Sequence, residues 1–99
     1  MQIKDGHAVA QIPLNEILWL EADGNYTVLY TESQKKRLLR SVITDLHNQL
    51  PQSEFLRIHR SYVVNKSKIV EFASGHVLVK ETKLPVGRTY RENVLTGLS

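Results

Sequence analysis

The sequence predicts a mainly β domain with two short helices. Most of the 99 residues fall into short apolar or alternating segments bounded by Gly, Pro, Asn, Asp or Ser, which is the pattern of short strands joined by turns. Apolar residues at helical spacing occur in only two places, residues 41–50 and 87–98. The length suits one domain, residues 1–99, and a content of 41% hydrophobic and 23% charged residues is typical of a soluble globular chain.

Eight segments have the composition of strands. In order they are HAVAQIPL (7–14), EILWLEA (16–22), YTVLYTE (26–32), KKRLLR (35–40), FLRIHRSYVVN (55–65), SKIVEFA (67–73), HVLVKE (76–81) and KLPV (83–86). Pro13 stops the first because it cannot donate to a strand ladder. EILWLEA has apolar residues at both odd and even positions (both parities), which indicates a strand covered on both faces. Turn signals stand at Asp5-Gly6, Asp23 to Asn25, Ser33-Gln34 and Ser74-Gly75.

SVITDLHNQL, residues 41–50, is the first predicted helix. Its apolar stripe at i, i+4 and i+8 consists of Val42, Leu46 and Leu50, with Ile43 beside it. Ser41 is the expected N-cap, and Pro51 ends the segment.

GRTYRENVLTGL, residues 87–98, is the second predicted helix. Thr89 and Glu92 have the spacing of a capping box, in which the side chains at the helix start bond to backbone N–H groups. Gly87 is an alternative N-cap, so the first helical residue stays open.

Composition excludes several classes of protein. Without cysteine the chain has no disulfide, catalytic thiol or cysteine-ligated zinc, which fits a reducing cytoplasm, and we expect a cytoplasmic location. It has no apolar run of about 18 residues, and because its first residues lack a basic region followed by an apolar one, we expect no signal peptide there. His7, His47, His59 and His76 lack the spacing of a metal pair, and we expect all but His59 to be exposed or half-exposed. We expect neither metal nor cofactor.

The distribution of charge points to nucleic acid. Residues 33–70 carry eight basic and two acidic residues, whereas residues 1–32 carry one basic and five acidic ones. Arg and Lys neutralise phosphates, and Arg also pairs with guanine edges. Three groups could serve: the turn at 23–26, the stretch at 57–60, and Arg88 with Arg91 at the start of a helix. A solvated surface with uneven charge is the alternative.

The segment FLRIHRSYVVN breaks the alternation of a half-buried strand. Leu56 and Ile58 alternate with Arg57 and His59, but Arg60 then falls on the apolar parity, and an apolar run restarts after it. A small domain thus places three basic or titratable side chains inside core-building sequence.

Three motifs, in order and at familiar spacings, resemble the LytTR family of DNA-binding domains. They are EILWLEADGNYTVLY, FLRIHRSYVVNKSKI and LPVGRTYRENV, and the resemblance runs from about Ile12 to Leu95. It departs from the family pattern at Gly87, where serine is frequent. The resemblance implies an elongated arrangement of small antiparallel β-sheets with two short helices, and loops that enter successive major grooves along one side of double-stranded DNA.

Carried onto this chain, the resemblance assigns three loops to DNA: Asn25 with Tyr26, then His59, Arg60 and Ser61, then the region of Arg88. It also explains the parity break, because a turn at 59–61 presents Arg60 outward. We expect Arg60 and Arg88 to reach base edges about one helical turn apart. Arg57, Lys66 and Arg91 should add phosphate contacts. An ion pair with Glu21 or Glu54 is the alternative for Arg60, and pairing with a neighbour is the alternative for Arg57.

The family also implies partners, and two rival functions stay open. Members mostly lie at the C-terminus of bacterial response regulators, so a receiver or other regulatory domain should precede Met1 in the full protein. Tandem direct repeats in a promoter are the expected target, bound by paired copies. One rival is a protein-interaction module that uses exposed strand edges. The other is a nuclease built from His59, Glu21 and a nearby lysine, although we expect a protein that is not an enzyme.

Overall fold

The mainly β prediction is confirmed. The computed structural model describes residues 2–5, 8–33 and 36–98. Its strands are β1 Gln2–Asp5, β2 Ala8–Gln11, β3 Ile17–Asp23, β4 Tyr26–Thr31, β5 Lys36–Leu39, β6 Phe55–His59, β7 Tyr62–Asn65, β8 Ile69–Ala73, β9 His76–Val79 and β10 Thr82–Pro85. The helices are α1 Ile43–Gln49 and α2 Arg91–Leu98, with 3₁₀ turns η1 Leu14–Glu16, η2 Lys66–Lys68 and η3 Arg88–Tyr90.

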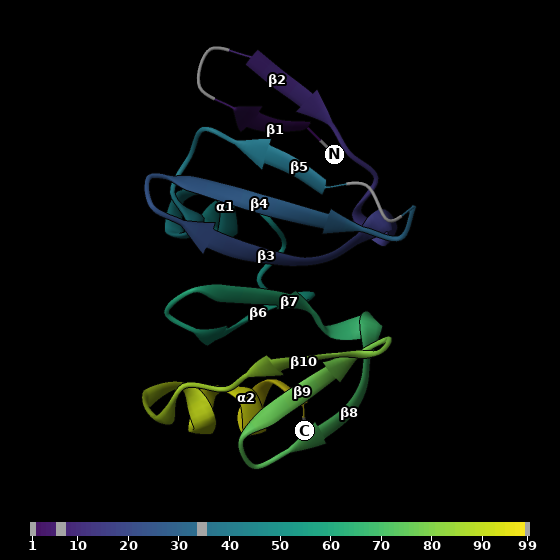
Figure 1. Ribbon diagram of the computed structural model, residues 1–99, viewed down its shortest axis with the longest axis vertical. Helices are drawn as coiled ribbons and strands as arrows, with labels where there is room; N and C mark the ends of the chain where they lie inside the picture. Colours follow the sequence, from purple (N-terminus) through teal and green to yellow (C-terminus); the bar gives the residue numbers. More distant parts are fainter. Residues whose placement is uncertain (1, 6–7, 34–35, 99) are drawn as a thin grey trace.

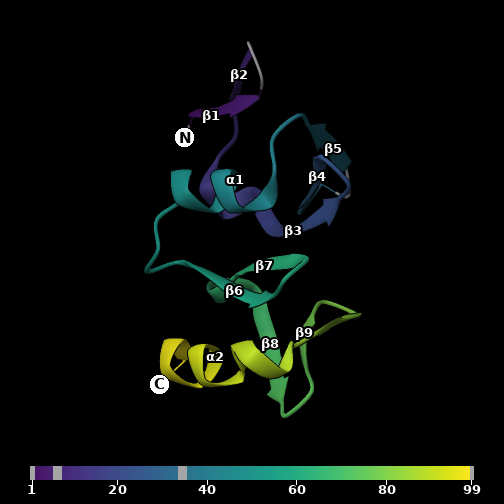
Figure 2. The same ribbon diagram turned by 90° about the vertical axis from the view of Figure 1, so that its left-hand side faces the viewer.

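The strands form three antiparallel sheets stacked along an elongated molecule of 38 × 25 × 22 Å (Figure 1). The β1–β2 hairpin lies at one end. The five-stranded sheet, in the order β5-β4-β3-β7-β6, occupies the middle, and the three-stranded sheet β10-β9-β8 lies at the other end. Helix α1 packs beside the middle sheet and α2 beside β6 near the C-terminal end (Figure 2). The elongated arrangement implied by the resemblance is therefore the observed one.

Strand β3 divides two hydrophobic cores, as its apolar residues on both parities predicted. Ile17 and Leu20 face the core that α1 covers, whereas Leu18 and Trp19 face the core shared with the three-stranded sheet and α2. The two neighbours Leu18 and Trp19 share one core because the register with β4 shifts between Ile17 and Trp19. Strict alternation along β3 would put Trp19 on the same face as Ile17, and the bulge breaks this alternation.

Strand boundaries differ from the sequence prediction in two places. The expected eight strands become ten among the described residues because residues 55–65 form the hairpin β6–β7, and because β1 pairs with β2. Strand β1 is short and has the polar sequence QIKD, so its apolar pattern was too weak to be seen. The predicted turns at Gly6 and Gln34 lie outside the described residues.

The N-cap predicted for the first helix was wrong, whereas the second helical segment starts at the alternative N-cap, Gly87. Val42, which is 42% exposed, occupies the N-cap of α1, so the buried face starts at Ile43. The Ser41 hydroxyl instead donates to the Lys4 carbonyl oxygen at 3.4 Å. Gly87 caps the 3₁₀ turn η3, and Thr89 lies within that turn, one turn before α2 begins at Arg91. Because the chain first forms this tighter 3₁₀ turn, Thr89 lies inside the turn and not at the N-cap position that the capping box requires.

Buried Asn65 at the end of β7 joins segments distant in the sequence. Its Nδ2 group donates to the carbonyl oxygens of Ile17 at 2.8 Å and Leu14 at 3.3 Å. Its Oδ1 atom accepts from the Ser67 amide at 3.2 Å and from the Ser67 hydroxyl at 2.9 Å. The side chain is 4% exposed, so water cannot replace these bonds at low cost.

We therefore expect Asn65→Ala to lower the free energy of unfolding by about 1–3 kcal/mol, the cost of leaving buried polar groups without partners. Asn65→Asp should cost at least as much, because it keeps the shape but removes the donor to Ile17. The measurement is urea unfolding followed by far-UV circular dichroism. Asn93 is the matched control: it is exposed, donates to the Arg57 carbonyl at 3.2 Å, and on truncation should change stability by less than about 0.5 kcal/mol. Equal losses of stability in the Asn65 and Asn93 variants would contradict a stabilising role specific to Asn65.

Candidate nucleic-acid interface

Three turns lie in a row along one long edge of the molecule, at the left of Figure 1: the β3–β4 turn, the β6–β7 turn and the segment before α2. Backbone hydrogen bonds hold them together. The Ala22 amide donates to the Ser61 carbonyl at 2.8 Å, and the Gly87 amide donates to the Ile58 carbonyl at 2.8 Å. The fold therefore brings together the three groups that the sequence selected separately.

The β3–β4 turn presents an amide and a phenol. Gly24 has φ of +61°, the left-handed conformation that glycine adopts without strain. Asn25 and Tyr26 follow it and are both exposed, Tyr26 at 44%. Leu39 pairs with Thr27, so exposed Arg40 stands beside the same turn. Sequence reasoning missed Arg40, although its position in the basic KKRLLR segment was a signal.

Hydrogen bonds from Arg57 shape the β6–β7 turn. The Arg57 guanidinium donates through Nε to the His59 carbonyl at 2.8 Å and through Nη2 to the Arg60 carbonyl. Its Nη1 atom donates to the Thr44 hydroxyl on α1 at 3.3 Å. The His59 ring completes the turn, because its Nδ1 atom accepts from the Ser61 amide at 3.0 Å. Arg57 thus has partners in neighbouring residues, two carbonyl groups and one hydroxyl, in line with the alternative of pairing with a neighbour.

Arg60, in contrast, is exposed at the tip of this turn. Within the described residues the ion pairs join Glu32 to Lys68 at 3.9 Å and to Lys80 at 3.3 Å, and neither involves Arg60. The alternative of an ion pair to Glu21 or Glu54 thus has no support. An exposed guanidinium on a turn fixed by four hydrogen bonds is well placed to contact a ligand.

The third turn depends on close packing at Gly87. A Cβ atom there would lie 3.0 Å from Tyr90 Cδ2 in the same turn and at an ordinary contact distance of 3.5 Å from the His59 ring, so glycine avoids crowding against Tyr90. The Arg57 guanidinium carbon lies 5.9 Å from the centre of the Tyr90 ring, which adds a cation–π contact. Arg88 and Arg91 are both exposed beside this packed junction.

Other predicted residues lie elsewhere. Lys66 follows β7, at the opposite end of that strand from the Arg60 turn. Its amide donates to the Glu54 carbonyl at 2.9 Å. His47 and His76 are half-exposed, as expected, and His7 lies outside the described residues. The structure thus leaves Lys66 away from the row of turns.

A metal-dependent nuclease gains no support from the geometry. In the part of the chain that the structure describes, no three His, Asp or Glu side chains cluster so that they could hold a metal ion. Glu21 instead faces two tyrosines. The pKa of Tyr30 and of Tyr62 is raised, first by burial and then by the charge of Glu21 and a hydrogen bond to its carboxylate.

Among the described residues, no helix is long and apolar enough to span a membrane.

Comparison with known proteins decides the family, because the sequence model of the LytTr DNA-binding domain matches residues 7–98. The chain belongs to the LytTR family of DNA-binding domains. An uncharacterised response regulatory protein of Vibrio cholerae is 32% identical over 96 residues, which cover 89% of this chain and 37% of that protein. The transcriptional regulatory protein YpdB of Escherichia coli K12 is 36% identical over 69 residues, or 70% of this chain and 28% of YpdB. This LytTR domain therefore spans about a third of the length of these relatives.

A solved structure has the same fold. The LytTr DNA-binding domain of a putative methyl-accepting/DNA response regulator from Bacillus cereus superimposes with a TM-score of 0.81, covering 100% of this chain and 95% of the other at 21% identity. At that identity the comparison establishes the arrangement of the sheets. The LytTR assignment itself comes from the sequence match, which includes all three turns.

Proposed function

We propose that this LytTR domain binds double-stranded DNA sequence-specifically, through the three turns aligned along one edge, as the output domain of a bacterial transcriptional regulator. The observation that carries the proposal is this alignment: the exposed side chains of Asn25, Arg60 and Arg88 project from turns that hydrogen bonds hold in fixed relation. Turns on a rigid scaffold are common sites of recognition. The role is binding and not catalysis.

The spacing of the turns suggests which groove each one meets. Arg60 and Arg88 lie two and one residues beyond a hydrogen-bonded pair, so their Cα atoms are at most roughly 17 Å apart. Successive major grooves on one side of B-DNA lie about 34 Å apart. This short separation supports neighbouring grooves for the two arginines better than successive major grooves. We assign those grooves to the outer turns, at Asn25 and Arg88, and the intervening minor groove to Arg60.

Other parts of the full protein would supply regulation. Since the chain covers about a third of its relatives, one of them a response regulatory protein, we propose that a receiver or another regulatory domain accompanies it. Pairing of two copies by that domain would raise the effective concentration of the second over a tandem repeat. A DNA-bound regulator of this kind would act in the cytoplasm.

The first test is salt dependence. Arg40, Arg60, Arg88 and Arg91 line the edge, and each brings one positive charge against the duplex, whether at a phosphate or inside a groove. Because each neutralised phosphate charge releases about one counterion, log K should fall with log salt at a slope of about −3 to −4. Fluorescence anisotropy of a labelled duplex, titrated between about 50 and 200 mM salt, measures the slope. A slope shallower than about −1 would contradict the electrostatic part of the proposal.

Alanine variants of Lys66 and Arg91, compared with each other, test where on the molecule the DNA interface lies. Arg91→Ala should weaken binding to all sequences alike and make the slope shallower by about 1. Lys66→Ala removes the same charge from the opposite end of β7 and should leave the slope unchanged, a revision of the phosphate contact expected from the sequence. Identical behaviour of the two variants would mean that the interface extends beyond the row of turns. A protein-interaction module would bind no duplex at all.

A further inference from the structure

The β6–β7 turn adopts neither of the turn types that usually close a two-residue hairpin. His59 pairs with Tyr62, so Arg60 and Ser61 form the turn. Types I′ and II′ match the twist of the flanking strands, but both need a residue with positive φ. Among the described residues, positive φ occurs in the β3–β4 and β9–β10 turns but at neither Arg60 nor Ser61. The shape of this turn therefore relies on bonds from side chains.

Arg57 supplies two of these bonds. Its Nε atom donates to the His59 carbonyl at 2.8 Å and its Nη2 atom donates to the Arg60 carbonyl, so one planar guanidinium fixes two successive carbonyl groups. Its Nη1 atom donates to the Thr44 hydroxyl at 3.3 Å, and its central carbon lies 5.9 Å from the centre of the Tyr90 ring. The guanidinium is thus held by the turn, by α1 and by η3.

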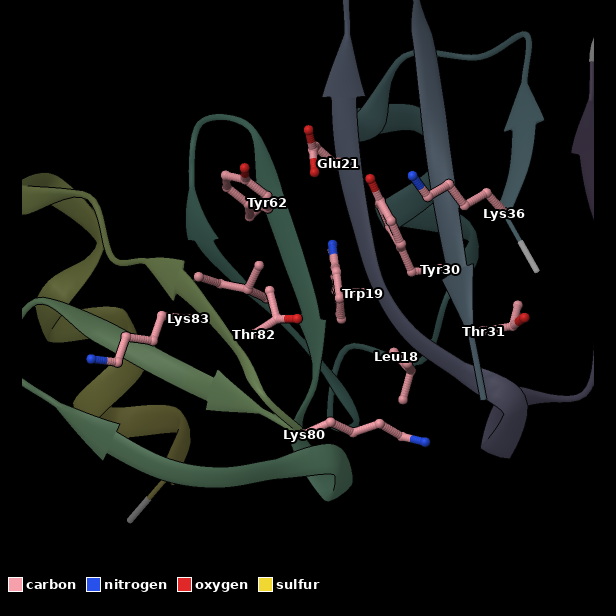
Figure 3. Close-up of a pocket in the computed structure, with 11 residues that line it drawn as sticks. Leu18, Trp19, Glu21, Tyr30, Thr31, Lys36, Tyr62, Lys80, Thr82 and Lys83 are labelled. Carbon is pink, nitrogen blue, oxygen red and sulfur yellow. The ribbon is translucent and has the colours of Figure 1, made fainter. Parts of the chain in front are cut away.

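The other side of the turn is held by aromatic packing. The rings of His59 and Tyr62 meet edge to face with their centres 5.6 Å apart, and the His59 Nδ1 atom accepts from the Ser61 amide at 3.0 Å. The Tyr62 hydroxyl points toward Glu21 on β3 (Figure 3). Because the turn is held from both sides, the exposed Arg60 side chain leaves it in one fixed direction.

We propose that Arg57 is a positioning residue for base recognition, whose guanidinium fixes the turn so that Arg60 enters its groove from one direction. A contact that is oriented before binding costs less to form. Lysine cannot take this role, because its ammonium is a point charge on a flexible stem and lacks the planar fork that spans the two carbonyls. This role rests on the proposed function, since Arg57 acts through Arg60. The phosphate contact predicted for Arg57 from the sequence is the competing role.

The variant Arg57→Lys separates charge from geometry. Selection from a random duplex library with the parent domain first supplies the preferred duplex. Arg57→Lys should then lower the ratio of affinities for the preferred and a random duplex roughly 3- to 10-fold, about the effect of one lost hydrogen bond, and leave the salt slope unchanged. Fluorescence anisotropy measures both quantities. Selection repeated with the variant should show a relaxed preference at the position of Arg60 and an intact one at the position of Arg88, whereas general destabilisation would affect both.

Two comparisons control the measurement. Arg37→Lys makes the same change at an exposed arginine of β5, outside the three turns, and should alter neither affinity nor preference. In a double-mutant cycle, Arg57→Lys should change the affinity ratio by less than about two-fold once Arg60→Ala has removed the residue through which it acts. Thermal melting confirms that each variant is folded.

Three results would overturn the role of Arg57. A parent-like preference in Arg57→Lys would show that the fork is not needed, and additive effects in the cycle would show that Arg57 acts independently of Arg60. If Arg57→Ala weakened both duplexes equally and made the salt slope shallower by about 1, Arg57 would be a phosphate contact. A parent domain that bound no duplex would refute the proposed function itself, so the two failures are distinguishable.

Discussion

Truncating Ile58 to alanine should lower the free energy of unfolding by about 2–4 kcal/mol. Ile58 is fully buried in the core shared by the middle sheet, the three-stranded sheet and α2. The change removes apolar contacts and leaves a cavity in a core where several elements meet, so the surroundings cannot easily collapse into it. Against a total of about 5–15 kcal/mol for a domain of this kind, the loss is large.

Arg60→Ala is the matched comparison, two residues along the same hairpin. Because Arg60 is exposed and makes no ion pair within the described part of the chain, its loss should change stability by less than about 0.5 kcal/mol. Urea unfolding of both variants, with shared slopes, gives the two values. Similar destabilisation by the two changes would show that Arg60 is a structural residue, and would weaken its assignment to DNA.

Turns and buried strands were the predictable part of the fold. The turn at 59–61 was expected from the LytTR resemblance, which explains the parity break at Arg60, although residues 55–65 were counted as one strand. The hairpin β8–β9 followed from Ser74-Gly75, because residues that favour turns act locally. The burial of β3 on both faces followed from its apolar residues on both parities. These signals lie within a few residues of the structure that they specify.

What the sequence could not show depends on interactions between distant segments. The β3 bulge, which sends Trp19 to the second core, depends on pairing with β4 and leaves no mark in EILWLEA itself. Composition likewise shows the charge of Arg57 but not its partners, the carbonyls of His59 and Arg60, and its phosphate contact stays a prediction. Lys66 is close to Arg60 in sequence, yet β7 separates the two residues, so we no longer expect it at the same row of turns.

The spacing between base contacts is the other quantity that needed three dimensions. From the sequence, Arg60 and Arg88 looked like independent loops one helical turn apart. The hydrogen bond from Gly87 to Ile58 makes them neighbours, and no feature of the LPVGRTY motif reports that bond. On this basis we now expect a separation of about five base pairs, at 3.4 Å for each base pair, in place of about ten.

Loss of either arginine should cost about 1–3 kcal/mol on the preferred operator and much less on random DNA. Arg88 in a major groove can present its forked guanidinium to guanine N7 and O6, so Arg88→Ala should relax a guanine preference at one position. Arg60, facing the minor groove between the outer turns, should sense groove width, and Arg60→Ala should relax a preference for narrow, A·T-rich sequence. Arg88→Lys should restore phosphate attraction without the fork, so specificity stays low.

Selection of bound sites from a random duplex library, repeated with each variant, measures these effects. The two relaxed positions should lie about five base pairs apart, within a spacing that a single rigid edge permits. Arg91→Ala, which removes an equal charge from the same edge, should keep the parent preference and lose affinity uniformly. If Arg60→Ala and Arg88→Ala behaved like Arg91→Ala, both arginines would be phosphate contacts, and base recognition would fall to Asn25 and Tyr26. If the relaxed base positions lay a full helical turn of DNA apart, the β6–β7 turn and the segment before α2 would have to separate on DNA. That separation would break the hydrogen bond between Gly87 and Ile58.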